Sequence, residues 1–245
     1  MRVIRRRGRD DTVRERMDSP DADSAMLAKT YAQFGLVNAV VAGERAVYRD
    51  WVRPRLSPVW GTRLLDVGTG GAGLPRRLLR WAHAEGLRLE VTAIDPDARA
   101  IGWARAQPPT PGLTLLQTTS AVLADAGEHF DLVLSNHVLH HLDGQAFGAL
   151  LADSERLAEF GGTVVHGDIE RSRLASVGFA LGTLPFASNL LRGSYIRADG
   201  LTSIRRSHTA GELAGVLPPG WRVRRAFPSR LEVVWQGDAA GRPRA

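Results

Sequence analysis

Short apolar runs alternate with amphipathic stretches through the middle of the chain. The apolar runs have the length of buried strands, and the stretches between them carry apolar residues at helical spacing. The pattern predicts strands at residues 63–67, 89–94, 113–117, 130–135 and 162–166. It predicts helices at residues 74–84, 98–106 and 145–159. Such alternation is typical of a parallel sheet with helices on both faces.

The end of the chain departs from this alternation. Thr209 and Glu212 have the spacing of a capping box, which predicts the start of a short helix. Strands follow at residues 221–227 and 231–236, and their short link requires an antiparallel hairpin, because a parallel crossover needs about a dozen residues or more. The sequence therefore predicts an α/β fold with a Rossmann-like, doubly wound sheet of seven strands, mostly parallel, with a C-terminal antiparallel hairpin.

Two covers are expected outside this sheet. Apolar residues recur at helical spacing over residues 26–41, and a second helix follows through Tyr48, which together predict an N-terminal helical lid. Residues 174–191 carry no formal charge, but glycines and a proline interrupt them, which favours a kinked helix over an apolar pocket rather than a membrane span. The predicted organisation is a charged tail and helical lid at 1–59, a core at 60–236 with a cap insertion at about 170–207, and a C-terminal tail at 237–245.

The overall composition narrows the function classes. Of the 245 residues, 44% are hydrophobic and 24% are charged, as in ordinary globular proteins. The absence of cysteine excludes disulfides, thiolate metal sites and cysteine nucleophiles. The formal net charge is +6, but the arginines between Arg2 and Arg9 resemble a solvated tail, so nucleic acid is not the expected partner. No apolar run near Met1 has the length of a signal peptide, which predicts a cytoplasmic protein without integral membrane association. A homodimer is left open.

Residues 64–73 form a buried strand that runs into a glycine-rich turn. Gly68, Gly70 and Gly73 satisfy the G-x-G-x-x-G fingerprint of dinucleotide sites, so the turn admits a nicotinamide cofactor or S-adenosylmethionine. Asp66 lies two residues before the first glycine, where its carboxylate would repel a pyrophosphate. An ammonium and a sulfonium group are complementary to it, which favours S-adenosylmethionine.

Four segments carry a resemblance to a known family: LLDVGTGGAG, VTAIDPD, HFDLVLSNHVLHHL and GGTVVHGD. Over residues 60–236 the chain resembles the class I S-adenosylmethionine-dependent methyltransferases, and within them the small-molecule branch that includes quinone and polyketide methyltransferases. The resemblance implies S-adenosylmethionine as the cofactor, with the methionine portion at Asp66 and the glycine turn and the ribose at Asp95. Many relatives have an acid after the third strand, whereas this chain has Thr119 and Ser120 there. The full set of residues assigned to the cofactor is Asp66, Gly68, Thr69, Gly70, Asp95, Pro96, Thr119, Ser120 and Asn136.

The acceptor chemistry is expected where the fourth strand ends, because ligands bind at the carboxyl edge of open α/β sheets. Neutral imidazoles there can accept the proton of a phenol, and a carboxylate after the fifth strand can orient a histidine or cap the next helix. The candidate catalytic residues are His137, His140 and Asp168. His166 and Glu170 lack convincing metal-ligand spacing, so no metal is expected.

A hydrophobic acceptor is expected between the two covers. The residues assigned to it are Tyr31, Phe34, Asn38, Phe179 and Phe186. The predicted function is O-methylation of a phenolic or polyketide-like small molecule in secondary metabolism. The alternatives are methylation of carbon or nitrogen on a similar molecule, a nucleic-acid-modifying methyltransferase recruited by the arginine tail, a nicotinamide oxidoreductase, and a fold that binds without catalysis.

Overall fold

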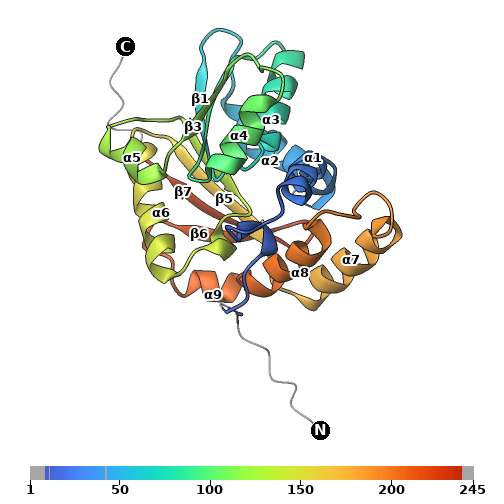
Figure 1. The fold of residues 1–245 in the computed structure, drawn as a ribbon. Helices are drawn as coiled ribbons and strands as arrows, with labels where there is room; N and C mark the ends of the chain where they lie inside the picture. Colours follow the sequence, from blue (N-terminus) through green and yellow to red (C-terminus); the bar gives the residue numbers. More distant parts are fainter. Residues whose placement is uncertain (1–8, 11, 42, 239–245) are drawn as a thin grey trace.

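A seven-stranded sheet with the order β3-β2-β1-β4-β5-β7-β6 forms the centre of the computed structural model (Figure 1). The structure describes residues 9–10, 12–41 and 43–238. Strands β1 to β5 are parallel, and β7 runs antiparallel to both of its neighbours, β5 and β6. The strand bounds are β1 (Thr62–Val67), β2 (Leu89–Asp95), β3 (Leu113–Gln117), β4 (Leu132–Asn136), β5 (Thr163–Ile169), β6 (Arg222–Ala226) and β7 (Arg230–Gln236). The predicted fold class is confirmed.

Helices cover both faces of the sheet. Successive strand residues point to opposite faces, so Leu64 belongs to the same buried cluster as Leu78 of α3, and Leu65 to the cluster that contains Leu150 of α6. The helices of the core are α3 (Gly73–Ala84), α4 (Ala98–Ala106), α5 (Ser120–Asp125), α6 (Gly144–Leu157) and α9 (Ala210–Ala214). The predicted strands and helices of the core agree with these bounds to within three residues.

The capping box of α9 is also confirmed. The Thr209 hydroxyl accepts the Glu212 N–H, and the Glu212 carboxylate accepts the Thr209 N–H. The sequence pattern did not predict α5 or α8 (Ile196–Arg206), which are short and interrupted by small or polar residues. It also did not predict that β7 lies between β5 and β6, because strand order depends on long-range pairing.

The two covers lie on the same side of the molecule (Figure 1). The first consists of α1 (Ser24–Val41) and α2 (Glu44–Val47), and the second of α7 (Arg173–Thr183) with α8. The predicted kink after α7 is present as a 3-10 turn that contains Pro185. Most large apolar side chains of α7 face solvent, with Leu174 76% and Leu181 62% exposed, while Phe179 points into a cavity. Among the described residues, no helix is long and apolar enough to cross a membrane.

Candidate active site

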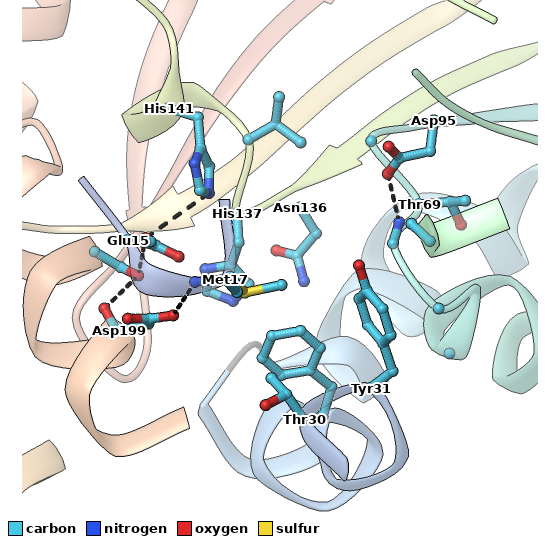
Figure 2. Close-up of a pocket in the computed structure, with 18 of the residues that line it drawn as sticks. Glu15, Met17, Thr30, Tyr31, Thr69, Asp95, Asn136, His137, His141 and Asp199 are labelled. Carbon is cyan, nitrogen blue, oxygen red and sulfur yellow. Dashed lines mark hydrogen bonds and ion pairs between the residues drawn. The ribbon is translucent and has the colours of Figure 1, made fainter. Parts of the chain in front are cut away.

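A cavity of about 500 Å³ opens at the carboxyl ends of β1, β2 and β4. One wall is the glycine turn after β1, together with residues 95–97 after β2. The segment 136–142 after β4 forms the floor, and Tyr31 and Phe34 of α1 close it from the other side, as Figure 2 shows for Tyr31. The cavity therefore joins the predicted cofactor turn to the predicted acceptor residues.

The glycine turn is fastened to β2 by backbone hydrogen bonds. The N–H groups of Gly68 and Thr69 donate to the Ile94 carbonyl at 2.9 and 3.0 Å. The Asp95 carboxylate accepts the Gly70 N–H at 2.8 Å, drawn in Figure 2, and the Asp97 N–H at 2.9 Å. A carboxylate has about four acceptor sites, so Asp95 keeps lone pairs for two further donors, such as ribose hydroxyls.

Gly68 is required by both conformation and space. Its φ is +70°, and a Cβ built on it would lie 2.5 Å from Cγ2 of Val138. Gly70 has a φ of +54°, but no described atom lies within 4 Å of a Cβ built there. Both glycines therefore have a backbone conformation that would strain another residue, but of the two only Gly68 also lacks space for a side chain.

Alanine at these two positions should destabilise the protein unequally. Gly70→Ala is expected to lower the free energy of unfolding by about 1–2 kcal/mol, the cost of a left-handed non-glycine residue. Gly68→Ala should cost about 1–3 kcal/mol more, because Val138 must move. Urea unfolding of both variants measures the difference, and equal losses would show that Val138 yields without strain.

Three carboxylates gather at the closed end of the cavity. Asp66 is buried at the end of β1, and burial, aided by the charges of Asp95 and Glu44, raises the pKa of its carboxyl to about 7. Glu44 of α2 is buried and paired with Arg77 of α3 through both carboxylate oxygens. This excess of acidic groups suits a ligand that carries positive charge.

His140 belongs to a buried ionic network. Its Nδ1 lies 2.7 Å from Oδ1 of Asp168, and its Nε2 lies 3.2 Å from Oε1 of Glu15. The His140 N–H donates to Asp168 Oδ2 at 2.9 Å, and Ser203 donates to Glu15 at 2.5 Å. Burial alone would lower the pKa of His140, but Asp168 and Glu15 raise it to about 10, so both ring nitrogens carry protons at neutral pH.

His137 has a different environment, although it is three residues away. It lines the cavity with a φ of +61°, and its Nδ1 lies 3.8 Å from Oδ1 of Asp168. Its Nε2 is buried and has no hydrogen-bond partner among the described residues. Figure 2 shows His137 close to Asn136 and Met17. His137 therefore keeps a ring nitrogen without a hydrogen bond within the described part of the chain, whereas both nitrogens of His140 are paired.

Twelve of the predicted site residues line this one cavity. They are Tyr31, Phe34, Asp66, Gly68, Thr69, Gly70, Asp95, Pro96, Asn136, His137, His140 and Phe179. Asp168 lies behind the histidines that it contacts. The Asn38 side chain lies outside the described residues.

Three more of the predicted site residues lie away from the cavity. Ser120 starts α5 and donates to the Asp153 carboxylate of α6 at 2.6 Å, and Thr119 is the residue before it. Phe186 is 46% exposed in the turn after α7. Since β3 is the edge strand of the sheet, the chain that follows it is two strands away from the glycine turn.

The segment before α1 contributes residues that sequence reasoning missed. The Asp199 carboxylate of α8 accepts the N–H groups of Arg16 and Met17 at 2.9 and 3.0 Å, which holds Glu15 and Met17 at the cavity (Figure 2). Arg9 donates to the carbonyls of Arg206 and Leu142 at 2.8 and 2.6 Å, so the expectation of a solvated tail is wrong at this position. Arg2, Arg5, Arg6 and Arg7 lie outside the described residues. No hydrophobic periodicity marks this segment, so the sequence carried no signal for it.

One group of side chains has metal-ligand geometry. Glu15, His140 and His141 each offer a ligand atom, and these atoms lie within 4.8 Å of one another. A metal requires an imidazole lone pair, whereas the two carboxylates beside His140 favour its protonated ring. The expected absence of a metal stays a prediction.

Comparisons with known proteins agree with this geometry. Residues 65–166 match the family model described as a methyltransferase domain. The ubiquinone biosynthesis O-methyltransferase of Rhizobium leguminosarum bv. trifolii is 31% identical over 137 residues, 55% of this chain and 50% of that protein. Its counterpart in Cereibacter sphaeroides (strain ATCC 17029) is 34% identical over 117 residues, 47% of this chain and 44% of that protein. The chain thus matches about half the length of these relatives.

Solved structures share the fold. The plantazolicin methyltransferase BpumL in complex with SAH has a TM-score of 0.60 at 12% identity, with 91% of this chain and 92% of that chain covered. Human N-acetylserotonin methyltransferase in complex with SAM has a TM-score of 0.60 at 11% identity, with 88% of this chain and 56% of that chain covered. At these identities the likeness shows the fold alone.

Proposed function

We propose that this chain, whose core is a class I S-adenosylmethionine-dependent methyltransferase, methylates a hydroxyl oxygen of a hydrophobic phenolic or polyketide-like small molecule. One observation carries the proposal: a single cavity is lined both by the carboxylates around the glycine turn and by His137, whose Nε2 has no hydrogen-bond partner among the described residues. The first end suits a cationic methyl donor, and the second suits an acceptor that must lose a proton.

Seven of the nine residues assigned to S-adenosylmethionine line the cavity. The glycine turn and the buried Asp66 would hold the methionine portion, and Asp95 would accept the ribose hydroxyls. Pro96 and Asn136 line the same cavity and complete the set. When bound there, S-adenosylmethionine supplies an already activated sulfonium methyl group.

The acceptor end would both align the acceptor and remove its proton. Alignment supplies about 7–11 kcal/mol in the best intramolecular cases, so the apolar walls at Tyr31, Phe34 and Phe179 serve catalysis by positioning an aromatic ring. His137 would take the phenolic proton on Nε2, and Asp168 would stabilise the resulting imidazolium from the Nδ1 side, while the donor would supply the methyl group and leave as the neutral thioether S-adenosylhomocysteine. His140, already protonated, is a positioning residue and not the base.

We further propose a core at residues 60–236 with its cap at about 170–207 and a lid within 1–59, in a cytoplasmic enzyme of secondary metabolism. Nucleic acid is not expected as a substrate. Methylation of carbon or nitrogen is the second candidate, because His137 can remove a proton from those acceptors as well.

Labelled methyl transfer to matched probes tests the acceptor class. The purified chain is incubated with methyl-labelled S-adenosylmethionine and a hydroxyarene, its methyl ether or the corresponding arylamine. We expect label on the hydroxyarene oxygen alone. Label on the arylamine or on a ring carbon would contradict O-methylation and support methylation of nitrogen or carbon instead.

Cofactor affinity should depend on pH through Asp66. Its pKa is raised to about 7 in the free protein, so a bound ammonium group, which favours the carboxylate, must displace a proton. Affinity for S-adenosylhomocysteine should therefore rise with pH, about tenfold from pH 6 to pH 8. Calorimetric titration across this range measures it, and Asp66→Asn should bind more weakly with no such slope. A flat profile in the wild type would remove Asp66 from the methionine site.

A further inference from the structure

Arg77 lies beside the glycine turn, next to Gly73, the third glycine of the fingerprint. A Cβ built on Gly73 would lie 3.2 Å from Nη2 and 3.5 Å from Nη1 of Arg77. The Arg77 side chain, 17% exposed, lines the cavity together with Gly73. The third position of the fingerprint thus makes room for a guanidinium group that lies over the turn.

Glu44 fixes the orientation of this guanidinium. Nη2 of Arg77 donates to Oε1 of Glu44 at 2.5 Å, and Nε donates to Oε2. The Glu44 side chain is 2% exposed, so the pair is held out of solvent. No hydrogen bond among the described residues uses Nη1 of Arg77, which leaves two N–H donors for a ligand.

A second cation, Arg230, lies near Glu44 and is attracted by its charge, although its ion-pair partner is Glu232 at 3.4 Å. A Cβ on Gly43, the residue before Glu44, would overlap the Arg230 guanidinium. Arg230 is buried, and its Nε and Nη1 have no hydrogen-bond partner among the described residues. Glu44 therefore keeps a further positive charge nearby when Arg77 shares its own charge with another anion.

We propose that Arg77 binds the α-carboxylate of the methionine portion of the cofactor, with Glu44 as its positioning residue. The inference rests on the proposed function and adds a recognition element to it. Asp66 and Arg77 would then present one acidic and one basic group to an amino acid zwitterion. Arg77 suits this role because its guanidinium is planar, stays charged and is held in place before the ligand arrives.

Two ligands that differ only in the carboxylate test the assignment. The full chain is titrated with S-adenosylhomocysteine and with decarboxylated S-adenosylhomocysteine, which keeps the ammonium, sulfur and adenosine groups. Arg77→Met should weaken S-adenosylhomocysteine about ten- to a hundredfold, as expected for a lost hydrogen bond between charged groups. It should change the affinity of the decarboxylated ligand by no more than about threefold.

Two further variants keep the test decisive. Arg77→Met leaves Glu44 buried without its partner, so the double variant Arg77→Met with Glu44→Gln, which removes both charges, should show the same ligand-selective loss. Arg80→Met, an exposed position of the same helix, is the matched control and should bind both ligands as the wild type does. Equal weakening of both ligands, or no weakening, would overturn the assignment of Arg77. If the wild type binds neither ligand, the proposed function itself fails.

Discussion

His137→Asn is expected to lower kcat for a phenolic acceptor by about 10²–10⁴-fold, the usual contribution of a general base. Nε2 of His137 has no hydrogen-bond partner among the described residues, and asparagine tolerates the +61° φ at this position better than most residues. Binding of S-adenosylhomocysteine should stay close to that of the wild type, because the glycine turn and Asp95 are unchanged. Single-turnover kinetics with saturating cofactor measure the chemical step directly.

The matched control for this variant is His83→Asn. His83 lies in the last turn of α3 and does not line the cavity, so its replacement should leave kcat unchanged. If His137→Asn kept the wild-type kcat, His137 would not act as a base, and alignment of the acceptor with the methyl group would be the whole catalytic mechanism.

Asp168→Asn is expected to lower the free energy of unfolding by about 3–5 kcal/mol, the usual cost of removing one partner from a buried ion pair. The substitution keeps the shape of the side chain but leaves the His140 imidazolium with only Glu15 as a counter-charge. The amide nitrogen of the introduced asparagine also cannot accept the backbone N–H of His140, which the second carboxylate oxygen of Asp168 does accept.

The stability difference should depend on pH in a defined direction. The folded pKa of His140 is raised to about 10, so its stabilising contribution is complete below its unfolded pKa of about 6.5 and is lost as the pH rises towards 10. Burial would raise the pKa of Asp168, but the charge and hydrogen bonds of His140 hold it below its usual range, so that contribution is lost only in acid. Urea unfolding at pH 5.5 and pH 9.5 should give the larger gap between wild type and variant at pH 5.5. An equal or larger gap at pH 9.5 would contradict the protonated state assigned to His140.

The cofactor half of the site could be predicted from the sequence because its signals are local. Asp66 and Asp95 end two strands that are adjacent in the sheet, and the glycine turn follows the first of them within three residues. Each feature can be recognised within a few consecutive residues. Because the two strands are parallel, their carboxyl ends lie at the same edge of the sheet. Thr119 and Ser120, which the resemblance also assigns to the cofactor, do not line the cavity. They follow β3, which is the edge strand of the sheet.

The acceptor half of the site depends on contacts between residues that are far apart in the sequence. The sequence makes His140 a candidate base, but Glu15, 125 residues away, lies against its second ring nitrogen. Glu15 reaches that position because Asp199 holds the backbone of Arg16 and Met17, across 183 and 182 residues. This polar segment has no hydrophobic periodicity, so its sequence does not predict that it packs against the histidines. The tertiary structure alone therefore determines which histidine has a ring nitrogen without a partner among the described residues.

Titration of the purified chain with S-adenosylhomocysteine and with NAD, in parallel calorimetric experiments at pH 8, tests the central claim most directly. The carboxylates around the glycine turn predict saturable binding of S-adenosylhomocysteine and no detectable binding of NAD, whose pyrophosphate would lie against Asp66. Preferential binding of NAD, or binding of neither ligand, would contradict the assignment of the glycine turn to a methyl donor.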